Sequence, residues 1–89
     1  MLYSANANFV SSSLNGEEML LDTKTGQYFG LNETAKLIWD SLRENKQTIS
    51  QLVNLICDAY DAEPDLVLKD VQEVLLQMVE SKSISATAD

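Results

Sequence analysis

The stretch from residue 21 to residue 39, LDTKTGQYFGLNETAKLIW, constrains the fold more than any other part of the chain. It places the end of an apolar strand, a turn, an aromatic strand and an amphipathic helix in direct succession. Gly26 suits the left-handed backbone position that a bulged hairpin loop needs. Asn32 stands where a helix N-cap belongs. The stretch therefore predicts two antiparallel strands that lead directly into a helix.

A second hairpin is predicted upstream of this stretch. The dipeptide Asn15-Gly16 lies between two strand-like segments and is the strongest short-range hairpin signal that a sequence provides. Together the two hairpins form a three-stranded antiparallel meander. If spatial order follows sequence order, residues 18–22 form the central strand, and residues 9–13 and 27–31 form edges with unpaired backbone groups. At least one edge is then free to accept a peptide strand.

Helical signals follow the strands. The first helix is predicted to start after Asn32 and to fade at residues 43–46. Its apolar stripe consists of Ala35, Ile38, Trp39 and Leu42. Thr48 and Gln51 have capping-box spacing and predict a second helix that runs to about Tyr60.

The third predicted helix is rich in apolar residues. Pro64 is a good first helical residue, and the helical pattern continues to about Ser81. The apolar positions cover more of the circumference than one buried face needs, so part of the helix is predicted to face a partner. These positions are Val67, Leu68, Val71, Val74, Leu75, Leu76, Met78 and Val79. Residues 83–89 are small and polar, and we expect them to fray, apart from Ile84.

Length and charge restrict the classes of function. A chain of 89 residues with 45% hydrophobic content is enough for one small domain with one core, but too small to enclose a deep catalytic cavity as well. Six basic against fourteen acidic side chains give a net charge of −8, which disfavours binding to DNA, RNA or anionic lipid. These numbers favour a non-catalytic domain with an exposed binding surface.

Cysteine and histidine usage narrows the chemistry further. Cys57 is the only cysteine and histidine is absent, so the chain cannot build an intrachain disulfide, a cysteine-rich zinc site or a Cys-His nucleophile pair. We expect no metal and no cofactor. The sequence shows no export signal and no apolar run of the roughly 20 residues that span a bilayer. A reducing, cytoplasmic location is the expectation.

The opening stretch also resembles the signature of PqqD-like domains, and the resemblance extends over about residues 8–82. The matching positions are Asp22, Gly26, Tyr28, Phe29, Leu31, Asn32, Thr34, Ala35, Ile38 and Trp39. PqqD-like domains are small winged-helix modules, known as RiPP recognition elements, that bind the leader peptides of ribosomally made and modified peptides. The resemblance implies an α+β fold of the winged helix-turn-helix type, with a three-stranded antiparallel sheet followed by three helices. We expect residues 1–89 to form one such domain, with an ordered core at about 8–82.

A strand edge beside an apolar helix is the geometry of β-augmentation, in which a peptide adds as an extra strand. We predict the leader-binding residues to be Gln27, Tyr28, Phe29, Gly30, Leu31, Val67, Val71, Val74, Leu75 and Met78. A plain core role is the preferred interpretation for Phe29, Leu31 and Leu75. Tyr28 and Gly30 alternate onto the opposite face of the strand.

The predicted function is to hold the leader of a precursor peptide as an added strand and to present it to a processing enzyme. The short free-standing chain resembles most the discrete recognition proteins of lasso-peptide pathways, where that enzyme would be a separate leader peptidase. The alternative within the family is a PqqD-type peptide carrier for a radical-SAM maturase. The protein is expected to be a monomer or a weak edge-strand dimer.

A remote alternative from another class is an acyl carrier protein modified at Ser41. Asp40-Ser41-Leu42 is the tripeptide at which such carriers take a phosphopantetheine arm. A carrier serine should open a helix after a long loop, whereas Ser41 stands near the end of a predicted helix. Three-residue motifs match by chance often, so this interpretation is disfavoured.

Overall fold

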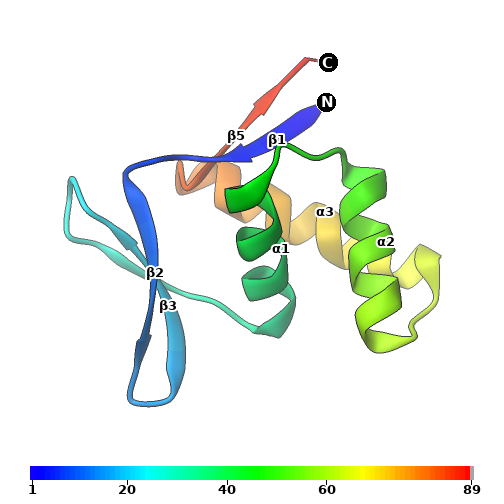
Figure 1. Ribbon diagram of the computed structural model, residues 1–89, viewed down its shortest axis with the longest axis horizontal. Coiled ribbons are helices and arrows are strands. Elements are labelled where there is room, and N and C mark those ends of the chain that lie inside the picture. Colours follow the sequence, from blue (N-terminus) through cyan, green and yellow to red (C-terminus); the bar gives the residue numbers. More distant parts are fainter. Residues whose placement is uncertain (89) are drawn as a thin grey trace.

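The computed structural model describes residues 1–88, in which four strands are followed by three helices and a last strand (Figure 1). They are β1 (Leu2–Ala5), β2 (Phe9–Leu14), β3 (Glu17–Asp22), β4 (Tyr28–Gly30), α1 (Glu33–Glu44), α2 (Ile49–Tyr60), α3 (Pro64–Glu80) and β5 (Ile84–Thr87). The α+β class with a three-stranded antiparallel sheet and three helices agrees with the sequence prediction. Strands β1 and β5 were not predicted.

The three-stranded sheet has the order β2-β3-β4, with both pairs antiparallel. Asn15 and Gly16 join β2 to β3 with φ angles of 54° and 82°. A two-residue turn of this hand matches the twist of the flanking strands, and both positions are ones that Asn and Gly tolerate. The prediction that β3 is central and that β2 and β4 are edges is confirmed.

The turn between β3 and β4 is held by Asp22. The Gly26 N–H donates to the carbonyl of Asp22 at 2.8 Å, and the Asp22 N–H donates to the carbonyl of Gln27 at 2.9 Å. The Asp22 carboxylate also accepts from the backbone N–H of Lys24 at 2.9 Å. Gly26 has φ of 79°, a conformation in which a Cβ would be strained. These bonds fix the point at which β4 begins.

The helix caps also agree with the sequence. The Asn32 side chain accepts from the Ala35 N–H at 2.8 Å and starts α1. Thr48 and Gln51 form the complete capping box of α2, and Pro64 is at the start of α3. Each cap satisfies or avoids backbone donors that the first helical turn leaves without partners.

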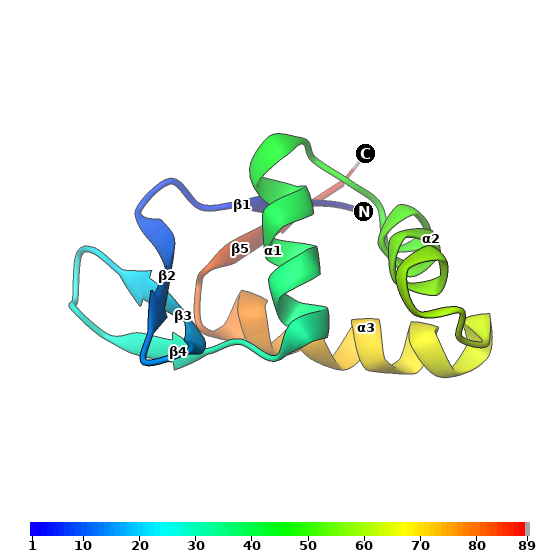
Figure 2. The same cartoon turned by 60° about the horizontal axis from the view of Figure 1, so that its bottom comes forward.

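The core lies between the helices and one face of the sheet. Phe9 and Leu20 are buried on the face toward the helices, whereas Val10 and Tyr28 are exposed on the other. The most deeply buried large side chains are Trp39, Leu20, Ile38, Leu52, Ile84 and Val71. Figure 2 shows that the helices lie to one side of the β2–β4 sheet, so its outer face is bare. Over the described residues, none of the helices combines the length and the apolar character that crossing a membrane requires.

The two ends of the chain form a separate antiparallel pair. Leu2 lies opposite Thr87, and Ala5 lies opposite Ile84, so β1 and β5 run side by side in both views (Figures 1 and 2). On its other side, Tyr3 of β1 exchanges backbone hydrogen bonds of 2.8 and 3.0 Å with Gln47. The expectation that the tail frays is wrong for residues 85–87, which belong to β5, and Asp89 lies outside the described residues.

The turn at Asp22 should show a defined pH dependence. Partial burial acts to raise the pKa of Asp22, but hydrogen bonds from Lys24, Thr25 and Asn8 outweigh it and hold this pKa below its usual range. A carboxyl group with a depressed folded-state pKa stabilises the fold above its unfolded pKa of about 3.9, and this contribution is lost as pH falls through the folded value. We expect Asp22→Asn to lower the thermal midpoint at pH 7 and to have a vanishing effect in acid. A midpoint difference that stays constant from neutral to acid pH would contradict this.

Candidate functional site: a groove between β4 and α3

Strand β4 has an open edge. Leu31 donates its N–H to the carbonyl of Glu18 in β3, and the carbonyl of Gln27 accepts from β3 as well, both at 2.9 Å. Because hydrogen bonding in an antiparallel pair involves every second residue, the backbone N–H and C=O groups of Tyr28 and Gly30 point away from β3. These groups can pair with an added strand.

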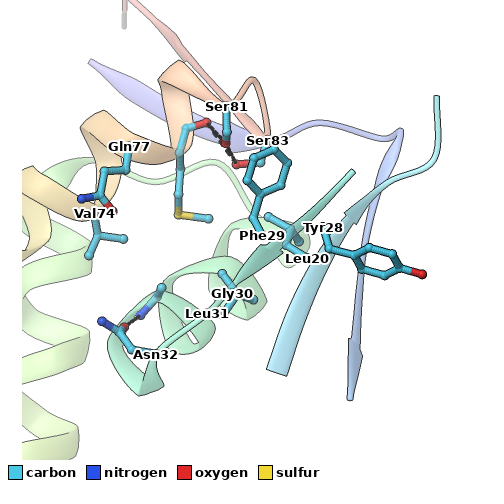
Figure 3. Close-up of a pocket in the computed structure, with 12 residues that line it drawn as sticks. Leu20, Tyr28, Phe29, Gly30, Leu31, Asn32, Val74, Gln77, Ser81 and Ser83 are labelled. Carbon is cyan, nitrogen blue, oxygen red and sulfur yellow. Dashed lines mark hydrogen bonds between the residues drawn. The ribbon is translucent and has the colours of Figure 1, made fainter. Parts of the chain in front are cut away.

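A groove of about 400 Å³ runs beside this edge, between β4 and the second half of α3 (Figure 3). Its lining residues are Leu20, Tyr28, Phe29, Gly30, Leu31, Asn32, Ala35, Val74, Gln77, Met78, Ser81 and Ser83. The volume is within the range of ligand pockets in general. In Figure 3, Val74 and Gln77 of α3 face the segment from Phe29 to Leu31 across the groove.

The end of α3 fixes one end of the groove. The Ser83 N–H donates to the carbonyl of Met78, and the Lys82 N–H donates to the carbonyl of Val79, both at 3.0 Å. This is a Schellman motif, in which Lys82 takes the left-handed position with φ of 67°. The hydroxyl groups of Ser81 and Ser83 also donate to the Met78 carbonyl, at 3.1 and 3.0 Å. Hydrogen bonds from backbone and side-chain groups therefore hold the wall that these residues form.

The structure brings six of the ten predicted leader-binding residues to the groove. These are Tyr28, Phe29, Gly30, Leu31, Val74 and Met78. Val67, Val71 and Leu75 are instead buried in the core, and none of them lines the groove. Gln27 lies in the turn before β4, where its N–H donates to the Thr25 hydroxyl at 3.2 Å.

The residues of α3 that were predicted to bind the leader mostly face inward rather than toward solvent. Val67, Val71 and Met78 are each at most 5% exposed. The side of α3 that borders the groove is rotated from these residues toward Gln77 and Ser81. The surplus of apolar residues on α3 is real, but the exposed ones are Leu66, Leu68, Leu76 and Val79.

Sequence reasoning missed the other six lining residues: Leu20, Asn32, Ala35, Gln77, Ser81 and Ser83. Helical spacing could have found two of them, since Gln77 and Ser81 continue the row of Val74 and Met78 at intervals of three or four residues. Ser83 follows the helix and reaches the groove only because the chain reverses at Lys82. No local sequence pattern predicts that reversal of the chain.

The groove is suited to binding rather than to acid–base chemistry. None of its lining residues carries a formal charge at neutral pH. The Ser83 hydroxyl is buried and bonded to the Met78 carbonyl and to Ser81, so it is not an activated nucleophile. An uncharged cleft beside free backbone groups is an arrangement that can accept an extended peptide.

Ser41 lies away from this groove, in the last turns of α1. Its hydroxyl accepts a hydrogen bond from the Gln47 side chain, and its carbonyl accepts from the same amide at 3.2 Å. A partly buried serine within a helix is not in the position of a carrier serine. The structure does not favour the acyl carrier alternative.

The fold and the uncharged groove define a small α+β domain with one strand edge open beside a helix. The family model described as Coenzyme PQQ synthesis protein D (PqqD) matches residues 17–84, a segment that contains β3, β4, all three helices and the start of β5. The chain therefore belongs to the PqqD family. A comparison with curated proteins gives no match.

Solved structures match the chain over nearly its whole length. TbiB1 in complex with the TbiA(beta) leader peptide is 28% identical, with a TM-score of 0.79 and coverage of 97% of this chain and 99% of that chain. Lasso peptide synthetase B1 complexed with the leader peptide is 19% identical, with a TM-score of 0.77 and coverage of 94% and 98%.

A third match is the solution NMR structure of the PqqD truncation of Methylobacterium extorquens PqqCD, which is described as a stand-alone RiPP recognition element. It is 17% identical, with a TM-score of 0.76, and the match covers 96% of this chain and 89% of that chain. The two matches below 20% identity show a shared fold.

The left-handed backbone conformation of Lys82 leads to a prediction about stability. A residue with a Cβ is strained in this conformation by about 1 kcal/mol or more, whereas glycine is not. We expect Lys82→Gly to raise the free energy of unfolding by about 1 kcal/mol. Lys82→Ala is the control, because it removes the charge and keeps the Cβ. An equal gain in both variants, measured by denaturant unfolding, would show that charge and not backbone strain is responsible.

Proposed function

We propose that the protein binds the leader segment of a ribosomally made precursor peptide as a strand added to β4, and presents it to a processing enzyme. In a lasso-peptide pathway that enzyme is a leader peptidase. The observation that supports this best is the free backbone edge of Tyr28 and Gly30 beside a groove whose far wall is α3. Such an edge provides hydrogen bonds, and the groove provides space for side chains.

Backbone pairing alone is too weak for this function. The N–H and C=O groups of Tyr28 and Gly30 can form four hydrogen bonds, worth about 1 kcal/mol net each. Association also costs translational and rotational freedom, and a micromolar complex needs roughly 8 kcal/mol net. Leader side chains must therefore insert into the groove, where each buried apolar side chain contributes about 1.5–3 kcal/mol.

Strand alternation specifies which leader side chains enter. In an antiparallel added strand, residues opposite Tyr28 and Gly30 have their side chains on the bare outer face, as those two residues do. The leader residue between them lies opposite Phe29 and is directed toward α3. We propose that this residue and its neighbours two positions away are the anchors, and that they contact Val74, Gln77 and Met78.

The solved relatives support a peptide occupant. TbiB1 and the lasso peptide synthetase B1 were both solved with leader peptides, and TbiB1 is more similar in sequence to this chain than the PqqD truncation is. One of these leader complexes is a lasso peptide synthetase B1, which agrees with the lasso setting that we propose; the alternative is a PqqD-type carrier for a radical-SAM maturase. Both roles use the same groove and differ in the enzyme that receives the peptide.

We propose that the arrangement is of the winged helix-turn-helix type, and its acidic charge favours peptide over nucleic acid as the partner. Lys69 is the only cation in α3, which also carries Asp65, Asp70, Glu73 and Glu80. Phosphates would meet net repulsion there.

We place the function in the cytoplasm, where the free thiol of Cys57 stays reduced. The protein acts as a monomer or as a weak dimer through an edge strand, and pairing at β4 would compete with the leader.

The first test is a titration of the protein with the leader segment of the precursor peptide encoded beside it. We expect micromolar binding, with amide NMR shifts concentrated in β4 and in residues 74–83. The N–H groups of Tyr28 and Gly30 should move downfield and become protected from exchange as they gain partners. Binding whose shifts lie outside this region would refute the groove, and no binding would refute leader recognition.

A second test adds a charge to the groove wall. Met78 is only 5% exposed, so a charge there would also disturb the core. Val74 is partly buried and lines the groove, and we expect Val74→Glu to weaken leader binding at least tenfold because it places a carboxylate where the leader side chains are to be buried. Leu76→Glu is the matched control, since Leu76 is on the same helix, 61% exposed and outside the groove. Equal affinity of both variants would remove Val74 from the site.

A further inference from the structure

Gly30 is a glycine that the fold itself does not require. A Cβ built at this position meets no atom within 4 Å, and its φ is outside the left-handed range. Gly16 and Gly26, by contrast, have φ angles near 80° that favour glycine. A glycine inside a strand lowers stability and leaves no side chain to pack. The absence of a side chain at Gly30 therefore calls for a cause outside the chain.

Gly30 creates a gap on the bare outer face of the sheet. Ser12, Met19 and Gly30 lie in one row across the three strands, and Met19 is only partly exposed. The neighbouring row is apolar and ends with the exposed ring of Tyr28 at the same edge. Figure 3 shows that this ring points away from the groove. The direct partner of Met19 on β4 is Gly30, which has no side chain to cover it.

The gap adjoins two hollows. Gly30 lines the groove beside α3, and it also lines a second hollow of about 680 Å³ between β3 and the start of α1. Met19 borders the second hollow as well. On the bare outer face (Figure 2), a side chain placed over Gly30 would have room as well, with Met19 of the same row beside it.

An added strand brings a side chain to this position. Gly30 has free backbone groups, so it forms a hydrogen-bonded pair with one residue of the added strand. Residues that are directly opposite each other share a face, and their Cβ positions lie about 5 Å apart. The side chain opposite Gly30 therefore projects on the outer face, over the gap. An aromatic or large aliphatic side chain can pack over a strand glycine in this way.

We propose that Gly30 determines specificity, because it provides a seat for a large apolar side chain of the bound leader, which lies across Gly30 and covers Met19. This inference rests on the proposed leader binding and adds a second point of recognition, on the opposite face of the leader from the groove anchors. The groove and the seat together contact consecutive residues of the leader. The seat selects by size, since any side chain at position 30 would occupy it.

The test fills the seat from within the chain. Gly30→Phe places a ring over Met19 and adds a residue that favours strands, so the thermal midpoint should be equal to or above that of the wild type. The leader segment of the neighbouring precursor should bind this variant on the order of tenfold to a hundredfold more weakly, which corresponds to the loss of one buried apolar side chain. Gly30→Ala should show a smaller loss.

Ser12→Phe is the matched control. Ser12 is in the same row and on the same face, but it belongs to β2 at the opposite edge of the sheet. It receives the same added ring, and its leader affinity should equal that of the wild type. An equal loss in Ser12→Phe and Gly30→Phe would show a general effect of the ring and would overturn the inference.

A leader variant completes the test. Replacing the leader residue opposite Gly30 by alanine should weaken binding to the wild type, and Gly30→Phe should then cause little further loss, because both changes remove the same contact. If the two losses of affinity are additive, the inference that Gly30 forms this seat is wrong. If the wild type binds the leader and Gly30→Phe binds it equally well, the seat is wrong and the proposed function stands. If the wild type binds no leader while folded, the proposed function itself fails.

Discussion

The carbonyl group of Met78 holds together the parts of the structure on which the groove depends. It accepts hydrogen bonds from the Ser83 N–H, the Ser83 hydroxyl and the Ser81 hydroxyl. These bonds end α3 and reverse the chain, so that Ser83 is fully buried and β5 runs back to β1. The Asn6 N–H then donates to the Ser83 carbonyl at 2.9 Å and joins the N-terminal segment to the same point. These bonds fix the end of α3, which forms one wall of the groove.

The local part of this architecture can be derived from the sequence, whereas the non-local part cannot. Asn15-Gly16, Gly26, Asn32 and Thr48 each act within a few residues, and the turns and caps that they predict are present. The pairing of β1 with β5 joins residues that are 79 to 85 positions apart. Its strands are short and contain serine and alanine, so they carry no alternation strong enough to be recognised. Their stability comes from contacts with the rest of the fold.

The candidate site shows the same division. The strand side was predicted almost completely, because Tyr28 to Leu31 are consecutive and their faces follow from strand alternation. The helix side was predicted less well. Val67, Val71 and Leu75 are apolar and lie at helical spacing, but the same pattern describes a core face, and here it is the core face. Only the packing of α3 against α2 and β5 determines how the helix is rotated, and that rotation brings Val74, Gln77 and Ser81 to the groove.

The short length of β4 links folding and recognition. An exposed strand edge is a risk for self-association, and a brief edge is one means by which proteins limit it. Strand β4 has three residues, so only two of them offer backbone groups outward. A random extended chain gains too little from these groups to remain bound. A peptide that also fills the groove with apolar side chains gains enough. The open edge is therefore selective. Its backbone sets the register of a bound strand, and the side chains on the two faces of that strand determine the affinity.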